Sequence, residues 1–256
     1  MKFNSYFNNI HRHYSIFSTT NILIVLRLKM FKGFSKKFIK VKKGKIYCRV
    51  GGKGLPLLLL HGYPQTHLMW HATADQLSKN FTVIIADLRG YGKSLTLRSD
   101  NKHLNYSKRE MAKDMVQLMN KLGFKKFFIA GHDRGGRVAH RLARDHRKKV
   151  IAMSVLDICP TLDMYENTTK EFAKAYFHWF FLIQPKWTPE TMIKSDPKKW
   201  MKNCLDKWSG KHKFGKVEEE YLKSFRKMKN IHASCEDYRA SATIDLEHDR
   251  KDLKKK

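Results

Sequence analysis

The sequence predicts an α/β protein with a doubly wound, mostly parallel sheet and a large helical segment added to it. Short apolar runs alternate with helical patterns over residues 55–160, which is the order typical of such sheets. Residues 161–245 then carry helical patterns rich in aromatic side chains and no strand-like run. A chain of 256 residues is long enough to bury the core of one domain of this kind.

The expected strands fall into two groups. Residues 38–41 and 46–50 flank a lysine-rich turn that contains Gly44, and they predict a β-hairpin. The later runs are continuously apolar, as in parallel strands that are buried on both faces. These buried runs cover residues 57–60, 82–86, 126–130 and 150–156. The helical patterns between them cover residues 67–79, 107–122 and 138–146.

Polar residues follow directly after four of these strands. His61, Asp87, Asp133 and Asp157 each lie at the carboxyl end of an apolar run. Binding and catalytic sites of doubly wound sheets lie beyond the carboxyl ends of the strands. We therefore expect a catalytic site where these side chains meet, with Asp87 in a structural role.

The stretch Gly131-His132-Asp133-Arg134-Gly135 is the most specific signal in the chain. It joins a buried strand to a helix, and glycines flank its central acid. The nucleophile elbow of α/β hydrolases has this form, G-x-S-x-G, with a serine at the centre. An aspartate at the centre instead predicts attack on a saturated carbon, with an alkyl ester as intermediate.

Composition limits the function classes. The net charge is +29, but the lysines are dispersed over the whole chain and no nucleic-acid-binding motif accompanies them. This favours solvated surfaces over nucleic acid as a partner, and the charge can steer anionic substrates. The cysteines contain no C-x-x-C pair, so we expect free thiols in the cytoplasm, no metal and no cofactor. The cysteines are Cys48, Cys159, Cys204 and Cys235.

The chain divides into four segments by composition. Residues 1–29 contain no acid, and their apolar run Ile22–Leu26 is too short to span a bilayer. We interpret them as a disordered extension or a wrongly assigned start, with Met30 as the true start. Residues 30–160 are the expected α/β core, and residues 161–245 are the expected helical cap over the strand ends. Residues 246–256 are a charged tail.

Several of these motifs together resemble the fluoroacetate (haloacetate) dehalogenases of the α/β-hydrolase superfamily. The resemblance is carried by His61–Pro64, by the elbow Ala130–Arg137 and by the cap segments His178-Trp179 and Cys235–Ala240. It extends from about Met30 onward. It therefore implies the α/β-hydrolase fold and cleavage of a carbon–halogen bond in a small α-halo carboxylic acid.

The resemblance also implies a role for each matching residue. Asp133 would be the nucleophile and Asp157 the acid of the catalytic triad. Arg134 and Arg137 would grip the substrate carboxylate, for which paired guanidinium groups are well suited. The expected halide donors are His178, Trp179 and Tyr238. The expected oxyanion loop consists of His61, Gly62 and Tyr63.

One part of the family pattern has no counterpart. The triad histidine of the family follows the last strand, after two strands beyond the cap. No histidine here occupies a matching position, since His232 and His248 belong to cap segments. We therefore expect the last two strands to be missing, the strand that ends at Asp157 to be an exposed edge, and full turnover to be doubtful.

Other interpretations stay open. An epoxide hydrolase shares the Asp nucleophile, but it usually has Trp where this chain has Arg134. A catalytically inactive hydrolase fragment and a basic binding protein are further alternatives, and a homodimer is not excluded. Taken alone, His178 and Trp179 would fit the core of a helical segment, and Asp157 would fit a helix N-cap.

Overall fold

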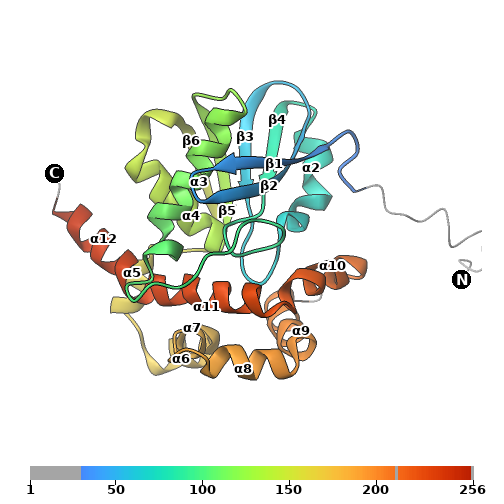
Figure 1. Cartoon of the computed structure of the whole chain (residues 1–256). Coiled ribbons are helices and arrows are strands. Elements are labelled where there is room, and N and C mark those ends of the chain that lie inside the picture. Colours follow the sequence, from blue (N-terminus) through green and yellow to red (C-terminus); the bar gives the residue numbers. More distant parts are fainter. Residues whose placement is uncertain (1–29, 211–212, 255–256) are drawn as a thin grey trace, which may run out of the picture.

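The structure is a computed structural model that describes residues 30–210 and 213–254 (Figure 1). The predictions made for residues 1–29 lie outside this range. The described sheet has the order β1-β2-β4-β3-β5-β6. Its strands are β1 (Ser35–Val41), β2 (Gly44–Gly51), β3 (Leu55–Leu60), β4 (Phe81–Ala86), β5 (Phe127–His132) and β6 (Val150–Leu156).

The pairing of the strands confirms a mostly parallel sheet. β3 pairs in parallel with β4 and β5, and β5 pairs in parallel with β6. The predicted hairpin is present, because β1 and β2 are antiparallel and close at Val41 and Gly44. The side chains of Leu58, Leu60 and Ile84 are fully buried, as expected for strands covered on both faces.

Three helices pack on the core sheet, and one prediction about them needs correction. They are α2 (His71–Leu77), α3 (Lys108–Lys121) and α4 (Arg134–Asp145). The sequence predicted a single helix over residues 67–79, but His67–Trp70 forms a separate 3₁₀ turn. The backbone N–H of His67 donates to Asp87 Oδ1 at 2.8 Å, and its ring Nδ1 lies 2.8 Å from the same oxygen. These contacts hold the first turn against the end of β4.

A side-chain cap at Ser107 marks the start of α3. Ser107 has an extended backbone, and its Oγ accepts a hydrogen bond from the N–H of Glu110 at 3.3 Å. This bond satisfies one of the backbone donors that every helix start leaves unpaired.

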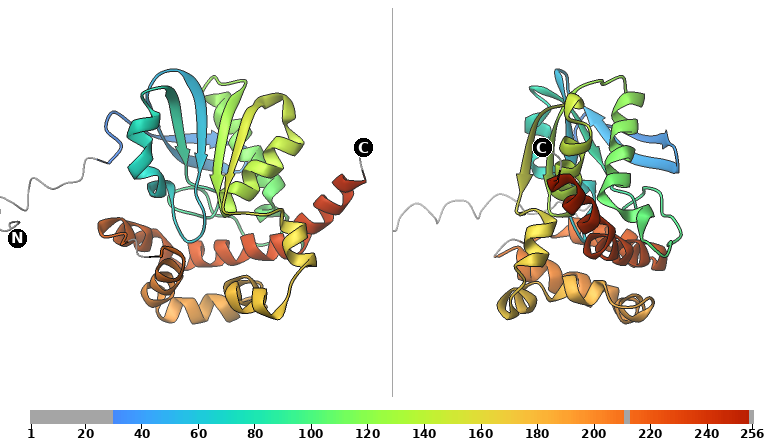
Figure 2. Two further views of the ribbon diagram at one scale, coloured as in Figure 1. Left: turned by 180° about the vertical axis from the view of Figure 1, so that it is seen from behind. Right: turned by 90° about the vertical axis from the view of Figure 1, so that its left-hand side faces the viewer.

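From residue 161 onward the described chain is helical, as predicted. Figure 2 shows these helices as a layer along one end of the sheet, which the strand ends face. The described helices are α5 (Thr161–Glu166), α6 (Lys170–Ala175), α7 (Phe177–Leu182), α8 (Thr188–Ser195), α9 (Pro197–Trp208), α10 (Lys216–Phe225), α11 (Met228–Ala242) and α12 (Ile244–Leu253). α12 crosses the boundary expected at residue 245, so the division into core, cap and tail stays a prediction.

Strand β6 forms one edge of the described sheet, in agreement with the expected exposed edge. It pairs with β5 on one side. Its apolar side chains Ile151, Met153, Val155 and Leu156 are between 39% and 45% exposed. An edge of this kind offers unpaired backbone groups and apolar surface to another chain segment.

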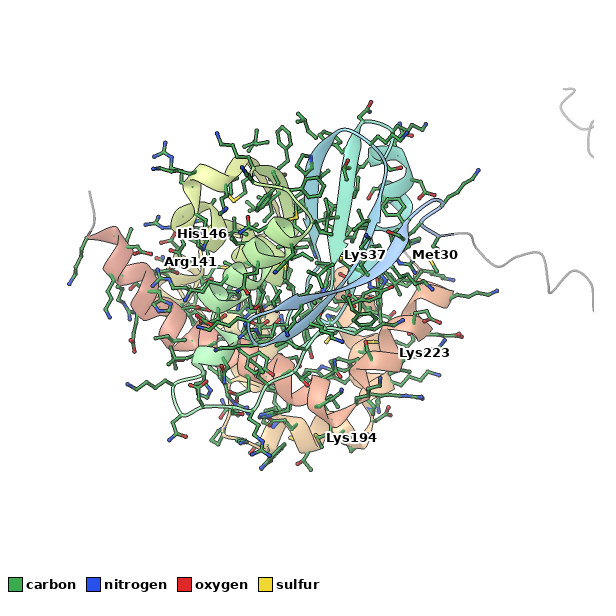
Figure 3. The ribbon with its side chains drawn as sticks, turned by 45° about the horizontal axis from the view of Figure 1, so that its top comes forward. Met30, Lys37, Arg141, His146, Lys194 and Lys223 are labelled. Atoms are coloured by element: carbon green, nitrogen blue, oxygen red, sulfur yellow. The ribbon has the colours of Figure 1, made fainter. Side chains whose placement is uncertain are left out.

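The basic side chains come from many elements. Figure 3 labels the exposed lysines Lys37 on β1, Lys194 on α8 and Lys223 on α10, and these lie at separate places in the view. This arrangement agrees with charge spread over solvated surfaces. Across residues 30–210 and 213–254, every helix is too short or too polar to cross a membrane.

Candidate active site

The elbow holds Asp133 in a strained backbone conformation. Asp133 has φ +48° and ψ −116°, a region that residues with a side chain rarely adopt. The flanking positions must be glycine, because there is no space for a side chain at either of them. A Cβ at Gly131 would lie 2.4 Å from the backbone O of Gly135, and a Cβ at Gly135 would lie 2.5 Å from the backbone O of His61. Strain of this kind is typical of functional sites.

The loop after β3 holds the Asp133 carboxylate. The backbone N–H of Tyr63 donates to Asp133 Oδ1 at 2.8 Å. Gly62 lies so close that a Cβ there would be 2.6 Å from Asp133 Cβ. His61 is fully buried, with Nδ1 2.9 Å from the backbone O of Gly62 and Nε2 accepting from the N–H of Leu88 at 3.0 Å. His61 therefore shapes the loop, while Tyr63 contacts the candidate nucleophile.

A cavity of about 700 Å³ lies in front of Asp133. Six residues predicted from the sequence line it: Tyr63, Asp133, Arg137, Asp157, His178 and Tyr238. Arg134 and Trp179 lie directly behind this lining. The Arg134 guanidinium carbon is 4.1 Å from the centre of the Tyr238 ring, and the Arg137 guanidinium carbon is 4.6 Å from the centre of the Trp179 ring. The predicted residues are thus brought together.

Arg134 is fully buried and is held mainly by Asp237 of α11. Its Nε and Nη2 donate to the Asp237 carboxylate at 2.9 and 2.8 Å, and Nη2 also donates to Ser241 Oγ at 2.6 Å. Lys108 and Tyr91 donate to the same carboxylate. Arg134 Nη1 is buried and has no hydrogen-bond partner among the described residues. The two N–H hydrogens of this nitrogen therefore make no hydrogen bond within the described part of the chain.

Arg137 shows the same pattern with different partners. Its Nη1 donates to the backbone O of Cys159 at 2.9 Å and to Thr161 Oγ1 at 3.0 Å, and its Nη2 lies 3.0 Å from Met164 Sδ. Its Nε is buried without a partner in the described part of the chain. The two guanidinium groups expected from the sequence are therefore present, and each has one nitrogen without a partner among the described residues, Nη1 in Arg134 and Nε in Arg137.

Aromatic side chains form another part of the cavity wall. The His178 and Tyr63 rings are stacked with centroids 6.3 Å apart, and the Trp208 ring lies 4.4 Å from His178. Burial lowers the pKa of His178 to about 4, so its ring is neutral at pH 7 and can donate an N–H. Burial also raises the pKa of Tyr238 well above its usual range, so its hydroxyl keeps its proton. That hydroxyl has no partner among the residues described.

Asp157 differs from the other predicted residues because its side chain is 82% exposed. It also has a positive φ, +56°, at the end of β6. The ring of His132 lies beside it, with Nε2 4.0 Å from Asp157 Oδ2. His132 lines the cavity and its Nδ1 has no partner within the described range. The predicted triad acid thus lies beside a histidine.

Sequence reasoning missed several residues of this site. His132 occupies the variable position of the elbow motif, which carries no signature of its own. Asp237 and Lys108 lie far apart in the chain and meet only in the folded structure. Asp87 takes the structural role predicted for it, since it accepts hydrogen bonds from the backbone N–H groups of His67 and Lys93 at 2.8 and 2.9 Å. Within the described residues, no cluster of His, Cys, Asp and Glu could hold a metal ion.

Comparison with known proteins decides the family. The sequence profile described as "alpha/beta hydrolase fold" matches residues 56–251. The chain belongs to the α/β-hydrolase fold family. A solved structure of a proposed α/β hydrolase from Nostoc sp PCC 7120 superimposes on this hydrolase with a TM-score of 0.86 and 52% sequence identity. The match covers 89% of this chain and 79% of that one.

Two curated relatives of this hydrolase bear on its chemistry. A fluoroacetate dehalogenase from a Burkholderia species is 47% identical over 227 residues, which cover 88% of this chain and 75% of the relative. A soluble epoxide hydrolase from Corynebacterium sp. (strain C12) is 41% identical over 111 residues, which cover 43% of this chain and 37% of the relative. The resemblance to dehalogenases noted from the motifs is therefore confirmed, and epoxide hydrolases are more distant.

Proposed function

We propose that this α/β hydrolase cleaves the carbon–halogen bond of small α-halo carboxylic acids through an ester with Asp133. One observation carries the proposal. Two residues that line the cavity with Asp133 carry buried donors without partners among the described residues, and Arg134, which lies behind this lining, carries a third. These donors are Arg134 Nη1, Arg137 Nε and Tyr238 Oη. Two cationic donors suit a carboxylate and a phenolic donor suits a departing halide. The relation to the Burkholderia dehalogenase supports the same substrate class.

The first chemical step follows from how Asp133 is held. Tyr63 N–H occupies Oδ1, which leaves Oδ2 to attack the carbon that bears the halogen. The bond from Oδ2 to carbon forms while the carbon–halogen bond breaks, and the halide leaves with the bonding electron pair. Arg134 Nη1 and Arg137 Nε hold the substrate carboxylate, so the carbon next to it is placed against Asp133. Because the two reacting groups are held together in one complex, the step becomes effectively unimolecular.

The departing halide needs donors because charge develops on it in the transition state. We assign this role to His178, Trp179 and Tyr238. Both titratable members suit it: His178 is neutral and Tyr238 is protonated at pH 7, so each can donate without carrying charge. The aromatic layer that carries two of them is the proposed cap over the strand ends.

The second step is hydrolysis of the ester. Water attacks Cγ of Asp133, and the negative charge that develops on Oδ1 is stabilised by Tyr63 N–H. The attacking water must lose a proton to a base. Among the described residues, His132 lines the cavity and lies 4.0 Å from Asp157, so this pair is the candidate base.

Incubation with chloroacetate separates the two steps. Intact mass spectrometry should show the addition of one carboxymethyl group, which peptide mapping should place on Asp133. The variant Asp133→Asn should gain no such group. Chloride release beyond one equivalent per protein, measured in parallel, reports turnover, since ester formation alone releases one chloride. Absence of both the adduct and chloride release from the unsubstituted chain would contradict the proposal.

An epoxide hydrolase is the second candidate. The shared Asp nucleophile and the Tyr238 hydroxyl, which has no partner among the described residues, would suit attack on an epoxide and protonation of its oxygen. A small neutral epoxide tested beside chloroacetate distinguishes the two. Diol formation without any reaction of chloroacetate would favour this second candidate.

The cysteines bear on location. All four are free, and Cys48, Cys204 and Cys235 are buried. Free thiols are typical of a reducing compartment, which supports our proposal of a cytoplasmic protein.

A further inference from the structure

A second array of catalytic side-chain types lies outside the Asp133 cavity. Ser99 belongs to the loop between β4 and α3, Glu190 to α8 and His232 to α11. The distance from Ser99 Oγ to His232 Nε2 is 2.5 Å, and the distance from His232 Nδ1 to Glu190 Oε1 is 2.8 Å. Three side chains from distant parts of the sequence thus form one continuous line of hydrogen bonds.

The order of the atoms in this line determines which of them carry a hydrogen. A carboxylate can only accept, so the hydrogen on the imidazole must lie on Nδ1 and point to Glu190. Nε2 then carries a lone pair and accepts the hydroxyl hydrogen of Ser99. This is the connectivity of a serine that a histidine activates and a carboxylate orients. Such triads are recognised by geometry and occur in different chain orders.

The orienting groups are rigidly held. The Glu190 side chain is fully buried and also accepts from Arg239 Nη1 at 2.7 Å. Hydrogen bonds from His232 and Arg239 lower the pKa of Glu190 to about 2, so it stays ionised. The Trp187 ring lies 5.0 Å from the His232 ring at an interplanar angle of 33° and covers it. The imidazole is therefore fixed both in its plane and in its protonation pattern.

Ser99 also has room beside it. It lines a cavity of about 520 Å³, to which Lys186 and Arg239 contribute cationic groups. This cavity shares no lining residue with the one in front of Asp133. Ser99 is partly exposed, while the His232 side chain is only 12% exposed. Ser99 thus borders a space large enough for a small molecule, and the histidine beside it is mostly but not fully buried.

We propose that Ser99 is the nucleophile of a second hydrolytic site that acts on small carboxylic esters. Ser99 Oγ bonds to the carbonyl carbon as its proton passes to His232 Nε2. The bond from that carbon to the alcohol oxygen breaks, and the alcohol leaves with the proton from His232. Water, deprotonated by the same nitrogen, then attacks the acyl-serine, which releases the acid and returns the proton to Ser99. None of these steps uses Asp133.

An activity-based probe tests this on the unsubstituted chain. A fluorophosphonate reacts with a serine whose hydroxyl is activated by a base, and it loses fluoride as the oxygen–phosphorus bond forms. After digestion, peptide mapping should place the phosphonyl group on Ser99. A chain that stays unlabelled, or a label on another residue, would overturn the proposal.

Hydrolysis of 4-nitrophenyl acetate tests the roles of the side chains. Ser99→Ala and His232→Gln should each lower the rate by about 100-fold or more, since a general base contributes 10²–10⁴-fold. The matched control is Ser195→Ala, because Ser195 is an exposed serine whose Oγ donates to the backbone O of Met192. It should keep the full rate. Loss of ester hydrolysis in Asp133→Asn, with Ser99→Ala unaffected, would assign the activity to the elbow and refute the proposal.

Discussion

Two buried arginine–aspartate pairs in this molecule differ in one respect. Arg89 donates from Nε and Nη2 to Asp114, both at 2.7 Å, and from Nη1 to the backbone O of Asn105 at 2.5 Å. Arg134 makes the same two-point contact with Asp237 but leaves Nη1 without a partner among the described residues. A buried donor left unpaired costs stability. The pair at Arg89 is therefore structural, whereas we propose that the pair at Arg134 leaves a donor for a ligand.

The largest effect is expected at the nucleophile itself. Asp133→Asn removes the attacking carboxylate while the side chain keeps its size. We expect the rate of ester formation from chloroacetate to fall by about 10⁴-fold or more, because loss of a nucleophile is among the most severe catalytic changes. Single-turnover mass spectrometry measures this. An adduct that forms at an undiminished rate on another residue would show that the elbow is not the reacting group.

The next effect concerns the carboxylate that holds Arg134. Asp237→Asn leaves Arg134 without its buried counter-charge and leaves Lys108 with Asp245 as its remaining one, and breaking a buried pair costs about 3–5 kcal/mol. We expect the free energy of unfolding in urea to fall by that amount. Asp206→Asn is the matched control, since Asp206 forms an exposed ion pair with Lys202 and should change stability little. An equal loss of stability in the two variants would show that the buried network contributes no more than an exposed ion pair.

Conservative changes at the two arginines sharpen the comparison directly. Arg134→Lys keeps the charge but loses the Nη1 donor that we propose for the substrate carboxylate, so we expect kcat/KM for chloroacetate to fall by about 10–100-fold, as for one charged hydrogen bond. Arg89→Lys should lower stability and leave kcat/KM nearly unchanged. Chloroacetamide, which lacks the carboxylate, should react equally with both variants. A similar loss of kcat/KM at both positions would argue that Arg134 acts only through the fold.

The smallest effect is a dependence of stability on pH at His178. Its pKa in the folded state is about 4, below the 6.5 of an unperturbed histidine. Between pH 4 and 6.5, the unfolded chain therefore binds a proton at this histidine and the folded chain does not. The free energy of unfolding falls as pH drops from about 6.5 toward 4. His178→Gln should weaken that dependence, as chemical denaturation at several pH values would show. An unchanged slope would mean that other groups dominate this pH range.

The sequence predicted the parts of the molecule that short-range rules determine. The elbow was recognisable because only glycine fits at Gly131 and Gly135, and the buried strands were recognisable because they are continuously apolar. The pairing of Lys108 and Arg134 with Asp237 could not be predicted, since it joins elements that are far apart in the sequence. The same holds for the Ser99 array, whose three members have no shared motif.

The exposed side chain of Asp157 and its neighbour His132 also escaped prediction. A pattern of strand residues shows where a strand ends but not which way the next side chain turns. Asp157 has a positive φ at this point, which a strand pattern does not predict. Likewise, the 3₁₀ turn at His67–Trp70 depends on hydrogen bonds from His67 to Asp87, which a helical periodicity does not reveal.

The hydrogen bond from Tyr63 N–H to Asp133 Oδ1 makes the two carboxylate oxygens chemically distinct. In the proposed cycle Oδ2 bonds to the substrate, leaves with the product and is replaced by an oxygen atom from water, while Oδ1 stays with the protein. A first turnover in water enriched in ¹⁸O should therefore yield unlabelled hydroxy acid and a chain heavier by one isotopic oxygen. The hydroxyl of each later product would come from the water consumed one turnover earlier, so that the protein retains an isotopic record of its last reaction.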